Sequence, residues 1–385
     1  MIDGRFGAVP LQYLARLRYG MGQPPPLSEE GVPILRATNI SRGRITSANL
    51  QRAHVDDLPL DRAPLLEPGE LLVVRSGAYT GDSAMVTEQW AGSAPGYDLR
   101  VTPLCGVEPR FISWSLLSRY CLDQIDLLRT RAAQPHLNAD ELASIQIPRP
   151  PLDVQRRIAD YLDQETGRID ELVEAQGRAL RLLDERATSL AYYSVMDADG
   201  LTTPLRYLAR YVNGHPFKPE DRSDTGYPII RIAQLLDPEA DVDRYDGNPG
   251  EYCHVDSGDL IFSWSATLAA QIWDRGPAYV NQHLFKVLPL AGIDRTWLRY
   301  ALEAAVHDLE PYMHGSTMTH ITRPMLSRVS VPCPEPDRQQ AVVDQIEGGL
   351  QRVERLRSAT TAQIRLLTER RQALVTAAVT GELEV

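Results

Sequence analysis

Ile147-Pro148-Arg149-Pro150 and Val331-Pro332-Cys333-Pro334 are two copies of the stretch that decides the fold. The second copy follows the first by 184 residues, and each leads into a long segment that alternates polar and apolar residues. Gln155 and Gln339 occupy matching places at the start of those segments. The chain is therefore composed of two related halves.

The repeat extends upstream to the beginning of each half. Residues 10–16 return as 204–210, and residues 31–36 return as 226–231. His136 and His320 also match, at the same offset as the proline stretches. The offset drifts between blocks, which places insertions in the connecting loops, where changes of length cost little free energy. The order is thus globule, helix, globule, helix.

The two long segments have the pattern of paired helices. No proline interrupts residues 153–193, and an apolar position recurs every seven residues in both copies. The positions are Leu162, Ile169, Gln176, Leu183 and Leu190, and then Ile346, Val353, Thr360, Leu367 and Leu374. A helix of ~40 residues is ~60 Å long and needs a partner for its apolar stripe. The duplicate is the obvious partner, in an antiparallel arrangement that carries the globules to opposite ends.

Two points about these helices stay open at the sequence level. Each helix could instead pack only on its own globule, as an ordinary core helix. Gln176 and Thr360 fall at the same central step of the stripe. A buried polar residue there can fix the register of two helices, but a solvent-facing interruption explains it equally well.

Each globule is expected to mix helices and strands. Residues 70–77 and 258–263 look like buried strands that follow a glycine turn, and residues 99–104 and 280–287 are further strand candidates. Residues 11–18, 111–128 and 296–307 look helical. The predicted fold class is mixed α and β, in two globular domains.

Composition limits the class of protein. The 385 residues are 43% apolar, enough for two modest cores, and no apolar run approaches the roughly 20 residues that a bilayer requires. The four cysteines are scattered, which argues against disulfides and against a zinc site. We therefore expect a cytoplasmic protein with no membrane association and no bound metal.

The charge balance is unusual for a protein that binds nucleic acid unaided. The chain has 40 basic and 51 acidic residues, a net charge of −11, and no segment has a positive excess. Local arginine clusters can still face DNA while acidic residues populate the far side. DNA binding by this chain would require basic partners.

Several catalytic motifs are missing from the sequence. It has no Gly-Lys dipeptide for a phosphate loop, no His-Glu-x-x-His helix, and no glycine-rich dinucleotide fingerprint. Asn248-Pro249-Gly250 only faintly resembles a methyltransferase motif and is better explained as a turn. The histidine pair His136 and His320 favours a cap or loop role. The chain is predicted to be a binding protein without catalytic residues.

With these features together, the chain resembles the specificity subunit of type I restriction-modification enzymes. The resemblance covers essentially all 385 residues and is carried most specifically by residues 145–158 and 33–36. The sequence departs from the family pattern at Val154 and Arg338, where glutamate usually precedes the glutamine, and at Cys333 and Glu335 in the second proline run.

The resemblance implies two target-recognition domains joined by two long antiparallel coiled-coil helices, related by a pseudo-two-fold repeat. The domains are then residues 1–146 (target-recognition domain 1), 147–195 (spacer helix 1), 196–330 (target-recognition domain 2) and 331–385 (spacer helix 2). Each recognition domain would read one half of a split double-stranded DNA target. The helices would dock two modification (methyltransferase) subunits, and restriction/translocase subunits would complete this host-defence complex. S-adenosylmethionine and ATP are expected on those partners and no cofactor on this chain.

Base recognition requires Arg, Asn, Gln, Ser or Thr at loops that face a groove. The predicted DNA-binding residues follow the repeated blocks in each half, with Lys218 as a phosphate contact. They are Asn39, Arg42, Arg44, Arg75, Ser76 and Tyr79 in the first half, and Lys218, Arg231, Gln234, Trp264, Ser265 and Thr267 in the second. The loops at 131–138 and 314–320 are further candidates.

Two other classes of function remain as alternatives. The acidic balance would suit a coiled-coil protein-protein scaffold with two peptide-binding heads and no nucleic acid. A self-contained methyltransferase or nuclease is disfavoured by the missing cofactor and phosphate loops.

Overall fold

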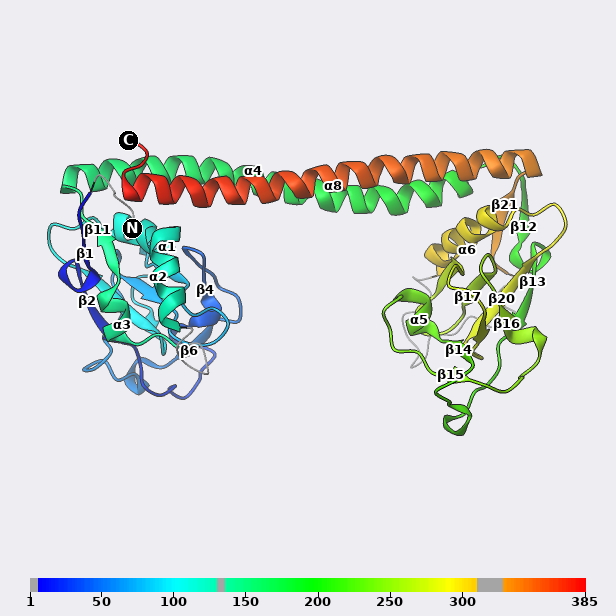
Figure 1. Cartoon of the computed structure of the whole chain (residues 1–385), viewed down its shortest axis with the longest axis horizontal. Coiled ribbons are helices and arrows are strands. Elements are labelled where there is room, and N and C mark those ends of the chain that lie inside the picture. The colour runs from blue at the N-terminus through cyan, green and yellow to red at the C-terminus, as the bar shows by residue number, and fades with distance from the viewer. Residues whose placement is uncertain (1–5, 130–135, 310–327) are drawn as a thin grey trace. The chain divides into compact units, whose positions relative to one another are not determined.

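A computed structural model of the chain describes residues 6–129, 136–309 and 328–385 (Figure 1). The chain divides into two compact units: unit 1 comprises residues 1–177 and 361–385, and unit 2 comprises residues 178–360. The long helices α4 (Leu152–Met196) and α8 (Pro336–Thr380) each contribute one part to each unit. The globular part of a unit is called its head below.

The head of unit 1 is built on a four-stranded antiparallel sheet in the order β2-β10-β7-β8. A three-stranded sheet, β6-β3-β9, lies beside it and contains one parallel pair, β3 with β9. The strands are β1 (Ala8–Pro10), β2 (Ala15–Tyr19), β3 (Val32–Leu35), β4 (Ile40–Ser41), β5 (Arg44–Ile45), β6 (Gln51–Ala53), β7 (Leu71–Val73), β8 (Ser83–Met85), β9 (Ala94–Pro95), β10 (Leu99–Pro103) and β11 (Gln146–Pro148). The helices are α1 (Pro109–Leu117), α2 (Arg119–Arg129) and α3 (Ala139–Ser144).

The head of unit 2 repeats this plan. Its first sheet has the order β13-β20-β17-β18, and its second has the order β15-β14-β19-β16, again with one parallel pair, β14 with β19. The strands are β12 (Leu201–Pro204), β13 (Ala209–Asn213), β14 (Tyr227–Ile230), β15 (Arg244–Tyr245), β16 (His254–Val255), β17 (Leu260–Ser263), β18 (Ala269–Ile272), β19 (Ala278–Val280), β20 (Leu284–Pro289) and β21 (Ser330–Cys333). The helices are α5 (Ile232–Leu236) and α6 (Arg295–Leu309).

Matching strand orders confirm the internal duplication. The two proline stretches also behave alike: β11 pairs with β1 at the start of the first half, and β21 pairs with β12 at the start of the second. Each half therefore closes on itself before its long helix begins.

The long helices are part of the core of each unit. In unit 1, Ile158 and Leu162 of α4 and Val375 of α8 are buried in one cluster with Phe111 and Ile112 of α1. In unit 2, Val195 of α4 and Ile346 of α8 join Trp297 and Leu298 of α6. Each head thus packs on both α4 and α8, through α1 in unit 1 and through α6 in unit 2.

Polar contacts show that α4 and α8 run antiparallel. In unit 2, Asp184 pairs with Arg357 at 3.2 Å, and ten residues later Ser194 accepts a hydrogen bond from Gln345 at 3.3 Å. In unit 1, Arg371 donates to Asp170 at 3.0 Å. The predicted pairing is confirmed, and the alternative in which each helix packs only on its own globule is wrong. Gln176 and Thr360 are both half-buried.

Local chemistry explains where α8 begins and ends. Pro336 opens it with Asp337 in the first turn, where a carboxylate is favourable at the positive end of the helix dipole. Gly381 follows the last turn at φ +80°, and Leu383 donates back to the carbonyl of Ala377 at 2.9 Å. A left-handed glycine that satisfies the last carbonyls in this way terminates the helix.

Three local predictions need correction. Residues 11–18 form a short 3-10 turn followed by β2 rather than a helix, because β2 pairs along its whole length with β10. Residues 280–287 divide between β19 and β20 and are not one strand. Residues 111–128 divide into α1 and α2 at Ser118, which is extended and donates to the carbonyl of Ser115.

The remaining local predictions are confirmed. Strands β7, β10 and β17 lie within or across the predicted segments, and α6 covers residues 296–307. In the part of the chain that the structure describes, no helix combines the length and the apolar content that a membrane crossing requires.

Gly349 allows the close approach of α8 to α4 in unit 2. A Cβ built on Gly349 would lie 2.2 Å from Cδ2 of Leu190, whereas one built on Gly348 would meet only Arg352, at 3.7 Å. Two adjacent glycines of one helix therefore differ in whether a side chain fits.

We expect opposite effects from substitution of these glycines. Gly348→Ala should raise the free energy of unfolding by about 0.5 to 1 kcal/mol, because alanine has the higher helix propensity. Gly349→Leu should lower it by about 1 to 3 kcal/mol, because the added side chain must displace Leu190. Calorimetry or urea unfolding of both variants measures the difference, and equal effects would contradict the observed helix pairing.

Candidate functional site

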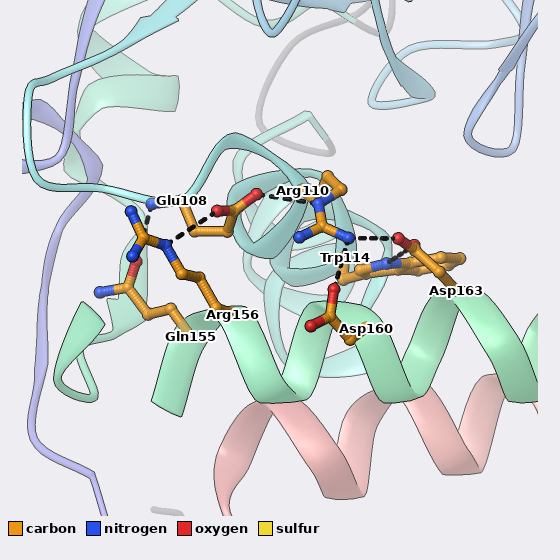
Figure 2. Close-up of polar contacts among 7 residues, drawn as sticks. All are labelled: Glu108, Arg110, Trp114, Gln155, Arg156, Asp160 and Asp163. Carbon is orange, nitrogen blue, oxygen red and sulfur yellow. Dashed lines mark hydrogen bonds and ion pairs between the residues drawn. The ribbon is translucent and has the colours of Figure 1, made fainter. Parts of the chain in front are cut away.

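A buried glutamine attaches each head to its long helix. In unit 1, Gln155 of α4 accepts a hydrogen bond from the backbone N–H of Glu108, the residue before α1, at 3.0 Å (Figure 2). Its amide nitrogen donates to the carbonyl of Pro150 at 2.8 Å. Only 4% of Gln155 is exposed. One side chain thus connects the head, the proline stretch and the helix.

Gln339 makes the equivalent connection in unit 2. It accepts from the backbone N–H of Asp294, just before α6, at 2.7 Å, and donates to the carbonyls of Pro334 at 2.8 Å and Gly292 at 3.1 Å. It is 1% exposed. The glutamine of the repeated stretch therefore has the same structural role in both halves. The sequence showed that Gln155 and Gln339 match but did not show what they bind.

Charged contacts strengthen the attachment in unit 1. Arg110 of α1 donates to Glu108 at 2.9 Å and to Asp160 and Asp163 of α4 at 2.8 and 2.9 Å (Figure 2). The indole of Trp114 also donates to Asp163, at 2.8 Å. In unit 2 the position of Arg110 is occupied by Thr296. The first head is thus held on its helix by charge as well as by the glutamine.

Three neighbouring strands of the first head end at the same edge. Leu99, the first residue of β10, lies opposite both Tyr19 at the end of β2 and Val73 at the end of β7. The segments that continue from these three strands therefore emerge together. Arg75, Tyr97 and Asp98 lie on those segments.

At this edge, two aromatic rings lie against the guanidinium of Arg75. Its guanidinium carbon lies 4.6 Å from the ring centroid of Tyr19 and 4.4 Å from that of Tyr97. The same group donates to Nε2 of His136 at 3.0 Å, since an arginine can only donate. We call Tyr19, Arg75, Tyr97 and His136 the arginine clamp. Both tyrosines are about half exposed, at 46% and 49%.

Asp98 lies next to the arginine clamp, and its carboxylate is buried. Burial raises its pKa to about 6, an effect that the backbone N–H and the charge of Arg75 partly offset. That N–H donates to Asp98 at 3.2 Å. A hollow of about 340 Å³ opens beside the clamp, with Ser76, Tyr97 and Asp98 in its lining. The site therefore combines a cation, flat rings and an adjacent cavity.

The same edge of the second head has different side chains. Strand pairing places Ser263 opposite Leu284, so the segments after β17 and before β20 emerge together there too. Trp264 packs against His283 and Phe285 in tilted ring contacts, both at 5.8 Å between ring centroids. Ser265 lies 3.1 Å from Nδ1 of His283, and Thr267 is exposed. The shared scaffold thus presents an indole where the first head presents a guanidinium.

Asn39 and Gln234 are buried in equivalent capping turns. Asn39 is fully buried, accepts from the backbone of Arg36 and donates to the carbonyls of Thr46 and Ala48 at 3.1 and 2.9 Å. Gln234 is 7% exposed, accepts from the backbone of Arg231 and donates to the carbonyl of Asp241. Both side chains organise a loop. Their contact with DNA stays a prediction, as does that of every residue proposed for the interface.

Several predicted basic contacts are paired with carboxylates. Arg44 donates to Asp170 of α4 at 2.8 Å, and Arg231 pairs with Asp243. Arg42 is exposed at φ +44° in the turn between β4 and β5, and Lys218 is exposed near Glu220, at 3.9 Å. Arg44 and Arg231 are thus held by carboxylates, whereas Arg42 and Lys218 are exposed.

The remaining predicted residues are close to the clamp or outside the described residues. Ser76 forms an isolated β-bridge with His136, and Tyr79 is 55% exposed in the turn that follows. Residues 131–135 and 314–320, which include His320, lie outside the described residues.

The sequence did not single out Tyr19, Tyr97 and Asp98. Tyr19 directly follows the segment 11–18 that the sequence predicts as a helix, and it is the last residue of β2; Tyr97 and Asp98 directly precede β10. Only the pairing of β2, β10 and β7 brings them beside Arg75. Within the described ranges, no three His, Cys, Asp or Glu side chains gather as a metal site would require.

Comparison with known proteins gives the family. A family model for the type I restriction modification DNA specificity domain matches residues 27–177 and again residues 212–365. The chain belongs to the type I restriction-modification DNA specificity family. The two matched segments correspond to the two halves of the repeat, each with most of its head and much of its long helix.

Individual relatives of this specificity-family chain agree. The specificity subunit of the type I restriction enzyme EcoBI from Escherichia coli is 27% identical over 180 residues, which span 46% of this chain and 38% of that protein. A solved chain from work on complex assembly and conformational transition of the type I R-M system superposes with a TM-score of 0.78 at 19% identity, covering 99% of both chains. The HsdS subunit from Thermoanaerobacter tengcongensis gives a TM-score of 0.63 at 18% identity, covering 100% of this chain and 98% of that one. At these identities the structures show a shared fold.

The buried glutamine gives a prediction about the attachment of the head. Gln155→Leu should lower the free energy of unfolding of unit 1 by about 2 to 4 kcal/mol, because the N–H of Glu108 and the carbonyl of Pro150 lose their buried partner. Gln164→Leu, at an exposed position of the same helix, should change it by less than about 0.5 kcal/mol. Hydrogen exchange at the start of α1, together with calorimetry, measures both. Similar behaviour of the two variants would show that the glutamine does not hold the head.

Proposed function

We propose that this chain is the DNA-specificity subunit of a type I restriction-modification complex. Each head would read one half of a bipartite double-stranded target. The observation that carries the proposal is the duplicated head. The same sheet order occurs twice, and the same sheet edge carries a clamped arginine in one copy and a stacked tryptophan in the other. Two copies of one scaffold with different side chains suit two different half-sites.

The partner subunits would supply the chemistry. Two modification subunits would carry S-adenosylmethionine and transfer the methyl group to adenine, and restriction/translocase subunits would use ATP. This chain would be the non-catalytic member of the complex, acting in the cytoplasm. Support comes from family membership over both halves and from the relatives named above.

Partner subunits also account for the charge of the chain. A net charge of −11 gives a poor unaided grip on the phosphate backbone, since non-specific DNA affinity comes from Lys and Arg that displace counterions. Basic surfaces on the modification subunits would provide that grip, while this chain provides sequence selection. The protein-protein scaffold predicts instead that DNA is never bound, even with those subunits present.

Mapping of adenine methylation tests the proposal. We expect the host genome to carry a bipartite methylated motif that disappears when the gene is deleted and returns when it is restored. A gel shift with the full chain and its modification subunits should select the same sequence. An unchanged methylome, together with no DNA binding by the assembled subunits, would favour the scaffold.

The length of the helices gives a further prediction of the proposed function. Each has 45 residues, about 68 Å at about 1.5 Å per residue. Insertion of one heptad into both helices, at the boundary between the units, preserves the seam and adds about 10 Å. The unread gap of the methylated motif should lengthen by about three base pairs, at about 3.4 Å each, with both half-sites unchanged. A substituted heptad of unaltered length is the control, and an unchanged gap after insertion would refute the spacing role.

A further inference from the structure

Arg75 differs from the other predicted arginines in what holds it. The guanidinium groups of Arg44 and Arg231 form salt bridges with Asp170 and Asp243, respectively. In the described part of the chain, the guanidinium of Arg75 forms no salt bridge, although the buried carboxylate of Asp98, which accepts from the backbone N–H of Arg75, lies close enough for its pKa to respond to that charge. The Nε atom is buried without a hydrogen-bond partner, so only the terminal N–H groups can meet a ligand. His136 takes one of its five N–H groups. Hydrogen-bonding capacity is therefore left for a ligand.

The clamp fixes the plane of this guanidinium. Tyr19 and Tyr97 stack on it from 4.6 and 4.4 Å, and such cation–π contacts stabilise a charge without consuming its N–H donors. His136 fixes the rotation within that plane. A side chain ordered before binding loses little conformational entropy when it forms paired hydrogen bonds. This suits recognition of one geometry better than a general attraction for phosphate.

The clamp also lies where the two heads differ. The matching segment of unit 2 carries Trp264, whose indole has one N–H, and that N–H already donates to the carbonyl of Gln282 at 3.2 Å. Selection of a base by an arginine guanidinium at this sheet edge would therefore be confined to the half-site read by unit 1.

The hydrogen-bonding pattern of the guanidinium, a planar fork of N–H donors, indicates which base it would select. In the major groove, guanine presents two acceptors, O6 and N7, at the spacing of two parallel N–H groups of arginine. Adenine and cytosine present a donor there, which would face the N–H groups of Arg75. We propose that Arg75, positioned by Tyr19, Tyr97 and His136, selects a guanine at one position of the half-site read by unit 1. This inference rests on the proposed function and deepens it.

A randomised DNA selection tests the proposal. The full chain, assembled with its modification subunits, is offered duplexes randomised over both half-sites, and the base preference is measured at every position. The variants are Arg75→Ala and Arg75→Lys, with Arg62→Ala as the control. Arg62 belongs to the same head and is 88% exposed. Lysine retains the charge but lacks the fork, so it separates base recognition from phosphate contact.

If the proposal holds, both Arg75 variants lose preference for guanine at one base pair by about 5- to 150-fold. Preferences at all other positions of that half-site and at the second half-site stay unchanged, and Arg62→Ala behaves as wild type. Tyr97→Phe should retain the preference, whereas Tyr97→Ala should weaken it, because the ring rather than the hydroxyl contacts Arg75.

Three results would overturn the inference. A match between Arg75→Lys and wild type, combined with an Arg75→Ala variant that weakens binding to all sequences alike with a shallower salt dependence, would mark a phosphate contact. Loss of the whole first half-site would mark a structural role. An unchanged preference in both variants would exclude contact. Failure of the wild-type assembly to select any bipartite sequence would instead contradict the proposed function itself.

Discussion

The attachment of each head depends on one buried amide. From the long helices, Gln155 and Gln339 bond backbone groups of two other segments, namely the residues just before α1 or α6 and the proline stretch. A buried N–H or carbonyl without a partner costs about 1 to 3 kcal/mol, so few other positions satisfy all of these groups at once. Together with the shared hydrophobic core, this connection holds each head on its long helices.

The two heads share their strand arrangement and differ in the side chains at the strand ends. The order of the first four-stranded sheet and the pairing of the proline stretches are the same in both halves, whereas the residues at the strand ends differ. Side chains at strand ends carry little of the core, so they can change without loss of stability. Arg75 in one head and Trp264 in the other show the outcome.

The net charge of the chain says little about the sites. Several arginines form salt bridges within the chain. Arg100 pairs with buried Glu70, Arg110 pairs with Asp163 of α4, and Arg44 pairs with Asp170 of α4. Arg75, held by two tyrosine rings and His136, instead keeps N–H donors that no salt bridge takes in the described part of the chain. The distinction between the two groups depends on neighbours distant in sequence.

The sequence by itself determined the duplication, the long helices, their antiparallel pairing and the family, because each of these is written as a repeat or a heptad period. It also placed Arg75 and Trp264 at matching positions. Only the tertiary structure decided that residues 15–19 form a strand, since pairing with β10 overrides local helix propensity. It likewise decided that Tyr19, Tyr97 and His136 meet around Arg75. Those residues lie on separate segments up to 117 positions apart in the chain, and strand pairing brings them together at one edge.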